Sequence, residues 1–166
     1  MFLIGNQSYR CSMHLVAVSD PQKYADTVDY WRDVYGFKMS CMKRPSIKEA
    51  SVEIVPAAAV VSASPALIHD IDMEKCEVED TQFESEFELR MRETCEVTAI
   101  AGYFDTIFDL ADKNRVEFTT GPHGKPTHWK QTGIIPLIAQ QNLHLFPTCW
   151  QFSTWRKSFL SKRRTY

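Results

Sequence analysis

His128 and Trp129 are the residues whose types and position could do chemistry in this 166-residue chain. They follow a turn-rich segment, residues 120–126, and open the last apolar run of the sequence. An imidazole can hold a carboxylate at neutral pH, and an indole can lie against a cationic group. A His-Trp pair is also a common packed anchor of a loop. Its meaning therefore depends on the elements that position it.

Length and composition indicate one globular domain. Hydrophobic residues make up 44% of the chain, charged residues 24%, and the net charge is -2, which is ordinary for such a domain. No apolar run reaches the roughly 20 residues of a membrane helix, and the first residues lack the charged and apolar regions of a signal peptide. We expect a cytoplasmic protein, possible also in the nucleus, with no membrane partner and no specific nucleic acid.

The cysteines and histidines predict neither a disulfide framework nor a metal site. The cysteine count is odd, and no two cysteines are spaced C-x-x-C. His144 and Cys149 could meet, but nothing nearby completes a metal shell. We interpret the five cysteines as reduced, mostly buried thiols: Cys11, Cys41, Cys76, Cys95 and Cys149.

A single helix is expected near the start of the chain. Asp20 followed by Pro21 is a good helix entry, and Gly36 would end the helix as a C-cap. Four apolar residues then form one stripe at steps of four, three and four: Tyr24, Val28, Trp31 and Tyr35. The stripe is heavily aromatic. It is either a core face or a surface that docks on another subunit, where aromatic residues are enriched.

The rest of the chain predicts short antiparallel strands in a sheet, sandwich or barrel. Residues 83–92 alternate most clearly, with the period of two that a half-buried strand shows. Gly102 marks a bulge or a close approach, and residues 43–45 mark a turn. Further strands are expected at residues 13–18, 49–55, 66–72, 97–110, 115–119 and 129–138, and the segment 115–119 should pair with 97–110.

Two charged segments stand out. The stretch from Asp70 to Glu96 holds eleven acidic residues against three basic ones. It is either a solvated sheet face or a field that attracts a basic ligand. The segment from Arg156 to Tyr166 is basic. Such a segment is normally a solvated tail, and the alternatives are a nuclear signal or a nucleic-acid contact. The acidic residues are Asp70, Asp72, Glu74, Glu77, Glu79, Asp80, Glu84, Glu86, Glu88, Glu93 and Glu96.

Motifs of an independent active site are missing. No Gly-rich loop follows a strand, so no cradle for a dinucleotide or S-adenosyl cofactor is present. The chain has no P-loop, no G-x-S-x-G and no nucleophile with a placed histidine. The residues alone therefore indicate a β domain with an aromatic helix and one His-Trp loop.

Three stretches together resemble the protein arginine methyltransferases. Residues 30–42 resemble the dimerisation arm of that family and the return from it into a β-barrel. Residues 99–105 resemble a central barrel strand. Residues 118–122 and 127–132 resemble the family's threonine-histidine-tryptophan loop with its lead-in. Details in residues 15–20 and 35–42 are most similar to the zinc-finger-containing subtype that modifies a ribosomal protein, and Thr127 before the histidine fits the type I, asymmetric-dimethylating enzymes.

The resemblance implies a role for several residues. His128 would pair with an acidic residue of the enzyme's other half and support the catalytic geometry, while Trp129 and Thr127 would contribute to the substrate arginine pocket. The acidic face would suit arginine-rich substrates such as histones or ribosomal proteins. The arm, at about residues 21–42, would join a homodimer or a full-length paralogue. Its residues would be Tyr24, Tyr30, Trp31, Tyr35, Phe37 and Met39.

The resemblance also has limits, which leave three functions open. It runs from about Cys11 to Thr132, inside an expected barrel domain of residues 11–138, and residues 1–10 and the segments after Thr132 match nothing. We expect residues 139–166 to be a disordered basic tail. S-adenosylmethionine would serve the complete enzyme, and none is expected to bind this chain, whose cofactor half and glutamate hairpin are absent. The chain is then the barrel portion of an enzyme, inactive alone, or a non-catalytic module that binds full-length subunits. The third possibility is an inert product of a truncated gene model.

Overall fold

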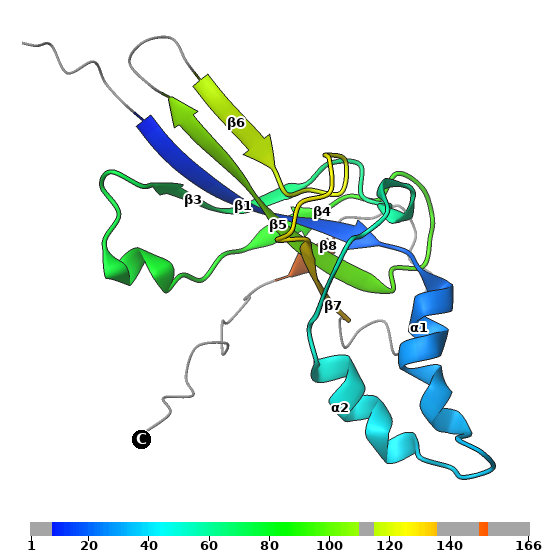
Figure 1. Ribbon diagram of the computed structural model, residues 1–166. Helices are drawn as coiled ribbons and strands as arrows, with labels where there is room; N and C mark the ends of the chain where they lie inside the picture. The colour runs from blue at the N-terminus through cyan, green and yellow to red at the C-terminus, as the bar shows by residue number, and fades with distance from the viewer. Residues whose placement is uncertain (1–7, 110–114, 136–149, 153–166) are drawn as a thin grey trace, which may run out of the picture.

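The computed structural model describes residues 8–109, 115–135 and 150–152. Antiparallel strands form most of it, and two short helices project from one end as an arm (Figure 1). The expected mainly β fold is confirmed. The strands are β1 (Ser8–Val18), β2 (Ser51–Glu53), β3 (Ala66–Asp72), β4 (Phe87–Leu89), β5 (Ala99–Asp109), β6 (Arg115–Thr119), β7 (Gln131–Ile134) and β8 (Trp150–Phe152). The α-helices are α1 (Pro21–Thr27) and α2 (Lys43–Lys48), and the 3-10 helices are Asp29–Arg32, Ser40–Met42, Ala57–Ala59 and Val78–Thr81.

The long antiparallel pair β1–β5 is the spine of the main sheet. It is in register from Ser8 opposite Asp109 to Val18 opposite Ala99. The strand order is β2-β7-β5-β1-β3, and β6 also pairs with β5, as expected for residues 115–119. The bulge or close approach expected at Gly102 is not found: the residue pairs in register with Leu15, and a Cβ there would make only an ordinary contact, 3.4 Å from the Leu15 side chain. Within the described residues the sheet does not close into a barrel.

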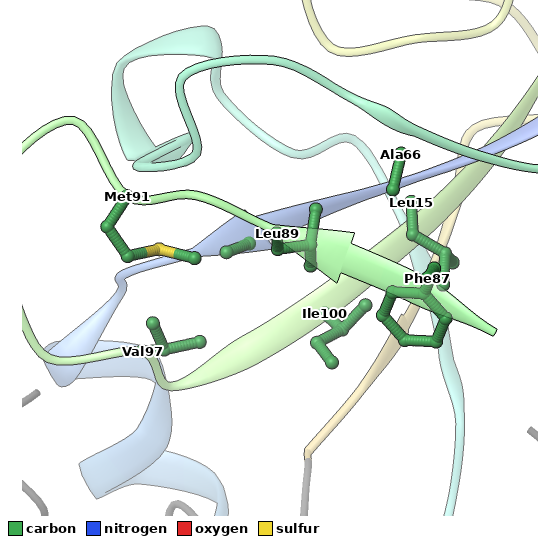
Figure 2. Packing of buried hydrophobic residues seen from close by; sticks show 8 residues of the cluster. Leu15, Ala66, Phe87, Leu89, Met91, Val97 and Ile100 are labelled. Carbon is green, nitrogen blue, oxygen red and sulfur yellow. The ribbon is translucent and has the colours of Figure 1, made fainter. Parts of the chain in front are cut away.

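The spine buries side chains on both of its faces. On one face Leu15 and Ile100 pack with residues of β4, as Figure 2 shows. On the other face Val16 and Ala101 pack with residues from the chain that follows β2. Because successive strand residues point to opposite faces, one strand pair supports two cores. Replacing the buried Leu89 with alanine should cost about 2–5 kcal/mol of stability.

Residues 83–92 form a shorter strand than the alternation predicts. Phe87, Leu89 and Met91 are buried, so the expected inward face is confirmed. Regular pairing covers only β4, which lies against β8, inside the segment expected to be a tail. Upstream, the Phe83 ring stacks on His69 of β3, with centroids 4.0 Å apart, rather than extending the ladder.

Other expected strands differ mainly at their ends. The segment 66–72 is a strand as expected, while β1 begins five residues earlier than its prediction. The predicted strands 49–55 and 129–138 shorten to β2 and β7. Leu110, residues 136–138 and the rest of the expected tail outside β8 lie beyond the described residues.

The predicted single helix of about three turns is wrong. α1 ends at Thr27, a 3-10 turn follows, and the chain reverses in a hairpin where Val34 bridges Phe37. Gly36, with φ +86, lies in this hairpin turn rather than at a helix C-cap. Thr27, Val28 and Asp29 have lower helix propensity than Gln22, Lys23 and Ala25, so the helix ends readily at this run.

A second α-helix forms where a turn was predicted. α2 begins at Lys43, and Pro45 lies in its first turn, where the missing N–H of proline removes no hydrogen bond of the helix. The Ser46 hydroxyl donates to the Thr27 carbonyl at 2.9 Å, so α2 is joined to the end of α1. Figure 1 shows the two helices side by side, away from the sheet.

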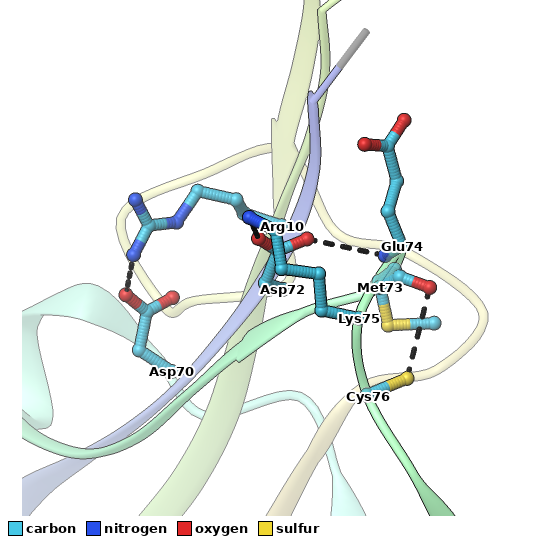
Figure 3. Close-up of polar contacts among 7 residues, drawn as sticks. All are labelled: Arg10, Asp70, Asp72, Met73, Glu74, Lys75 and Cys76. Carbon is cyan, nitrogen blue, oxygen red and sulfur yellow. Dashed lines mark hydrogen bonds and ion pairs between the residues drawn. The ribbon is translucent and has the colours of Figure 1, made fainter.

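The acidic stretch lies mostly at the surface. All its acidic residues except Asp72 and Glu88 are exposed. Arg10 of β1 pairs with Asp70, and Lys75 pairs with Asp72 at 2.6 Å in the turn after β3, as Figure 3 shows. The Lys75 hydrogen bond holds the pKa of the Asp72 carboxyl below its ordinary value. The basic partners therefore offset only part of the negative charge.

The described cysteines are free thiols, but they are not mostly buried. Cys41 and Cys76 are exposed, while Cys11 and Cys95 are half-buried. Burial raises the pKa of both half-buried thiols. No helix within the described ranges is long and apolar enough to cross a membrane.

Candidate functional site

Residues 120–130 form a loop of two tight turns between β6 and β7. In the first turn the Gly124 N–H donates to the Gly121 carbonyl at 3.1 Å, with Pro122 between them. In the second turn the Lys130 N–H donates to the Thr127 carbonyl at 3.1 Å. Lys130 takes a φ of 56, which costs a residue with a Cβ about 1–2 kcal/mol. The second turn therefore holds His128 and Trp129 in a strained, defined position.

Trp129 presents a half-exposed indole, 49% accessible, on an aromatic support. Its ring stacks on Phe118 of β6, with centroids 5.6 Å apart and planes 16° apart. It also meets the edge-on ring of Phe104 at 5.8 Å and the tilted ring of His128 at 3.8 Å. Such a supported aromatic surface can receive a cationic or apolar group.

His128 is exposed and makes no ion pair with any described residue, so the acidic partner that the resemblance implies is not found here. The Thr127 Oγ1 is buried and has no hydrogen-bond partner within the described part of the chain. The structure thus brings Thr127, His128 and Trp129 together at one turn. No carboxylate within residues 8–109, 115–135 and 150–152 pairs with the histidine.

Two buried polar residues, which the sequence analysis missed, join the ends of this loop. The Gln131 amide donates to the Thr120 carbonyl, and the Gln131 Oε1 accepts from the Val55 N–H at 2.7 Å. The Thr120 Oγ1 accepts from the Phe104 N–H at 3.0 Å and donates to the Phe104 carbonyl at 2.9 Å. Both side chains are almost fully buried, at 2% and 0% exposure. The sequence feature that could have indicated them is their position, since each is a polar residue at one border of a turn-rich segment.

A titratable cluster lies beside the same loop on β1 and β5. The His14 ring stacks on Tyr103 at 5.2 Å, and its Nε2 lies 3.3 Å from Asp105. Burial, with the Asp105 charge as the smaller cause, raises the pKa of Tyr103 to about 12. A Cβ at Gly121 would lie only 2.8 Å from the Tyr103 ring. Glycine is therefore required where the loop starts.

Two apolar residues of the arm are buried, while the tip of the arm is exposed. Val28 and Ile47 are the buried apolar residues of this unit, and Lys43 pairs with Asp29 at 2.8 Å. At the tip, Tyr35 is 93% exposed and Phe37 is 72% exposed. The tip aromatics therefore do little for the folding of the arm itself.

The other expected arm residues lie along its length. The Tyr30 ring, 48% exposed, meets the Trp31 ring edge-on at 5.3 Å. The Met39 N–H donates to the Trp31 carbonyl at 3.2 Å, and so joins the two sides of the arm. Tyr24 lies at the root, where it lines a cleft of about 120 Å³ between α1 and the β2–β7 side of the sheet. Burial raises the pKa of the Tyr24 hydroxyl.

These features define an open antiparallel β domain with a projecting helical arm whose aromatic tip is exposed. A sequence profile described as the arginine methyltransferase oligomerization subdomain matches residues 9–135. The chain belongs to this family, and residues 9–135 match its oligomerization subdomain.

Relatives and solved structures agree with this assignment. The chain is 37% identical to the probable protein arginine N-methyltransferase 1.2 of Arabidopsis thaliana, over 74% of the chain and 33% of that protein. It is 38% identical to the ribosomal protein arginine N-methyltransferase rmt3 of Schizosaccharomyces pombe, over 73% of the chain and 24% of that protein. The chain therefore spans about a third or less of the curated relatives that it matches.

Two solved structures illustrate the fold. One is the Trypanosoma brucei PRMT1 enzyme-prozyme heterotetrameric complex with AdoHcy, with a TM-score of 0.73 and 26% identity over 86% of this chain and 42% of that chain. The other is PRMT6, with a TM-score of 0.57 and 18% identity over 86% of this chain and 47% of that chain. The second likeness concerns the fold alone.

The described residues do not fit S-adenosylmethionine, the cofactor that the family implies. The arm-root cleft, at about 120 Å³, is smaller than the roughly 300–1,000 Å³ of pockets for ligands of that size. The junction of β1 and α1, Ser19-Asp20-Pro21, holds no glycine that would let a backbone approach the cofactor. No step of methyl transfer is therefore derived from this chain.

Proposed function

We propose that this chain serves as the substrate-binding and dimerisation portion of an S-adenosylmethionine-dependent protein arginine N-methyltransferase. The observation that carries the proposal is the arm: the Ser46–Thr27 hydrogen bond and the Lys43–Asp29 ion pair join its two sides, while Tyr35 and Phe37 at its tip are exposed. Aromatic side chains are enriched at the cores of protein interfaces and provide much of their binding energy. The arm therefore provides an anchor for another subunit.

The loop supports the substrate part of the proposal. Arginine stays protonated in proteins, and its planar guanidinium stacks on aromatic faces. Trp129, half-exposed and supported by Phe118, offers such a face. His128 is exposed beside it and free to meet a carboxylate of another part of the enzyme. We assign Trp129 and Thr127 to the arginine pocket and His128 to the support of the catalytic geometry.

The acidic surface supports a cationic substrate class. Acidic residues from Asp70 to Glu96 are mostly exposed, and basic partners offset only some of them. A surface of one sign raises the local concentration of ligands of the opposite sign. Arginine-rich proteins such as histones or ribosomal proteins have the matching charge.

A finer proposal concerns the subtype. The resemblance in residues 35–42 favours the zinc-finger-containing subtype, and Thr127 before His128 favours type I, asymmetric dimethylation. The 38% identity to rmt3, a ribosomal protein arginine methyltransferase, is compatible with this subtype. Mass spectrometry of the arginine products of the assembled enzyme tests the type, because symmetric dimethylarginine would exclude it.

Methyl transfer by a full-length relative such as rmt3 tests the proposed function. Chain added to the relative should enter its subunit pairs through the arm. We expect the methylation of an arginine-rich protein, per full-length subunit, to change in proportion to the added chain. The double substitution Tyr35→Ser and Phe37→Ser should abolish this effect. Val78→Ser, at an equally exposed apolar residue away from the arm (77% exposed), should not.

A second function, a non-catalytic module that binds full-length subunits, is favoured by one comparison. The trypanosome relative is a complex of an enzyme with a prozyme, so subunits of unequal kind assemble in that protein. The direction of the activity change separates the two functions. A module of this kind lowers the activity of the relative as mixed pairs replace complete ones. A working barrel portion raises the activity of the relative.

A further inference from the structure

We infer that Gln131 is a positioning residue, which clamps the turn carrying Trp129 to the root of the arm. This inference deepens the proposed function and rests on it for its meaning. Gln131 lies at the start of β7, directly after the turn from Thr127 to Lys130. Its side chain is 2% exposed, so its polar atoms require partners within the protein.

The partners of Gln131 are two backbone groups from different parts of the chain. Its amide donates to the Thr120 carbonyl, 11 residues earlier, where the loop begins. Its Oε1 accepts from the Val55 N–H at 2.7 Å, 76 residues earlier. Because a backbone N–H can only donate, this bond fixes which end of the amide faces Val55. The orientation of the other end, toward a carbonyl, follows.

Each partner is itself held in place. Thr120 is fully buried, and its hydroxyl and backbone N–H both bond to Phe104 of the β5 spine. Val55, 7% exposed, belongs to the second core with Val16 and Ala101. The clamp therefore joins the two ends of the loop to each other and to the rigid spine.

The clamp also links the loop to the arm. Val55 ends the short stretch by which the chain returns from α2 through β2, and it lines the arm-root cleft together with Tyr24 of α1. A shift of the arm root would thus displace the group to which Gln131 bonds. A shift of Gln131 in turn releases the turn that holds Trp129. Residues of the loop tip are exposed and make no equivalent bond to the arm root within the described residues.

The substitution Gln131→Glu tests this geometry in the chain itself. A protonated carboxyl can donate to the Thr120 carbonyl and accept from Val55, as the amide does, whereas a carboxylate only accepts. Burial raises the pKa of the introduced carboxyl above its ordinary value of about 4.3. Glu53, opposite Gln131 on β2, and its ion-pair partner Lys23 of α1 are charged groups close to this position, so the unsubstituted chain is measured alongside.

The readout is amide hydrogen exchange from about pH 4 to pH 8, expressed as protection factors. In Gln131→Glu, protection of the Gly124 and Lys130 amides should be native-like at acid pH and fall about tenfold or more once the carboxyl ionises. Amides of β1 and β5 should change less than the loop amides. The unsubstituted chain should show no such step.

The carboxylate of Gln131→Glu could lower loop protection simply because it is a buried charge. Two further variants test the clamp without introducing a charge. Gln131→Met keeps the size of the side chain but removes both hydrogen bonds, and it should lower loop protection about tenfold at every pH. Thr132→Val, at the exposed neighbour on the same strand, should leave it unchanged. Equal losses in loop and spine, or no loss in Gln131→Met, would overturn the inference. Amide hydrogen exchange does not depend on methyl transfer. The inference about Gln131 can therefore fail or hold whether or not the proposed function is correct.

Discussion

The indole of Trp129 stacks on the ring of Phe118, with centroids 5.6 Å apart and planes only 16° apart. Phe118 lies in β6, just before the loop, and Trp129 lies in the second turn of the loop, just before β7. One face of the indole is thus covered by the protein while much of the ring remains accessible. This ring contact packs the loop against β6, and the hydrogen bonds of Gln131 tie its two ends together.

Phe118→Leu should loosen Trp129 without unfolding the sheet. Loss of the stacked ring should cost about 0.5–1.5 kcal/mol of stability beyond the area change, and the tryptophan emission should shift to longer wavelength as the indole gains solvent. Equilibrium unfolding and fluorescence spectra measure both. The matched control is Phe108→Leu, which removes an edge-on contact between β5 and Tyr9 of β1, in the same sheet but away from the loop. An equal spectral shift in the control would contradict the assignment.

Lys130 should be a site where the side chain can be improved. Its φ of 56 is unfavourable for lysine, while asparagine tolerates the left-handed region better. Because Lys130 is exposed, Lys130→Asn should raise the free energy of unfolding by about 0.5–1 kcal/mol. Lys130→Val, which is β-branched, should lower it by a similar amount. Urea unfolding measures the free energy of unfolding of both variants. Equal changes in the two variants would mean that the turn is unstrained.

Tyr103 should make stability fall at alkaline pH. Its folded pKa is raised to about 12, whereas the unfolded value is about 10. Between these values the unfolded chain loses the proton and the folded chain keeps it, so unfolding becomes easier as pH rises. Below about pH 10 the contribution is fully present. Thermal unfolding from about pH 8 to pH 12 should show a weaker decline in Tyr103→Phe. Identical slopes for both chains would refute this origin.

This chain should bind no S-adenosylmethionine at ordinary concentrations. The cleft at the arm root is about 120 Å³, and no described loop offers a glycine-rich backbone to the ligand. Isothermal titration should give only the heat of dilution, with a full-length relative as the positive control. Micromolar binding, with saturable heat, would show that the fit argued from the described residues is wrong.

The local patterns of the sequence predict the strands better than the arm. β3 and β6 follow from short β-branched or alternating runs bounded by turns, and β4 keeps the predicted inward residues Phe87 and Leu89. The arm depends on long-range contacts instead. The Ser46 bond to Thr27 and the Lys43 pair with Asp29 join residues 19 and 14 positions apart. Helical spacing along one segment does not contain this information.

The sequence likewise predicts only part of the candidate site. The residue types at Thr127, His128 and Trp129 identify the loop, because their chemistry is visible in the sequence. The role of Gln131 is not visible there. Its partners are backbone groups, which have no sequence identity, and one of them, Val55, lies 76 residues away. Only the fold brings these groups together.

Sedimentation velocity of this chain with a full-length relative such as rmt3 tests the central claim, that the arm joins another subunit. We expect a mixed complex, weakened at least about 30-fold by Tyr35→Ser with Phe37→Ser, since two anchors at an interface centre are lost. Val78→Ser should bind as the unchanged chain does. A mixed complex that forms equally well with the double substitution, or no complex with the unchanged chain, would contradict the claim.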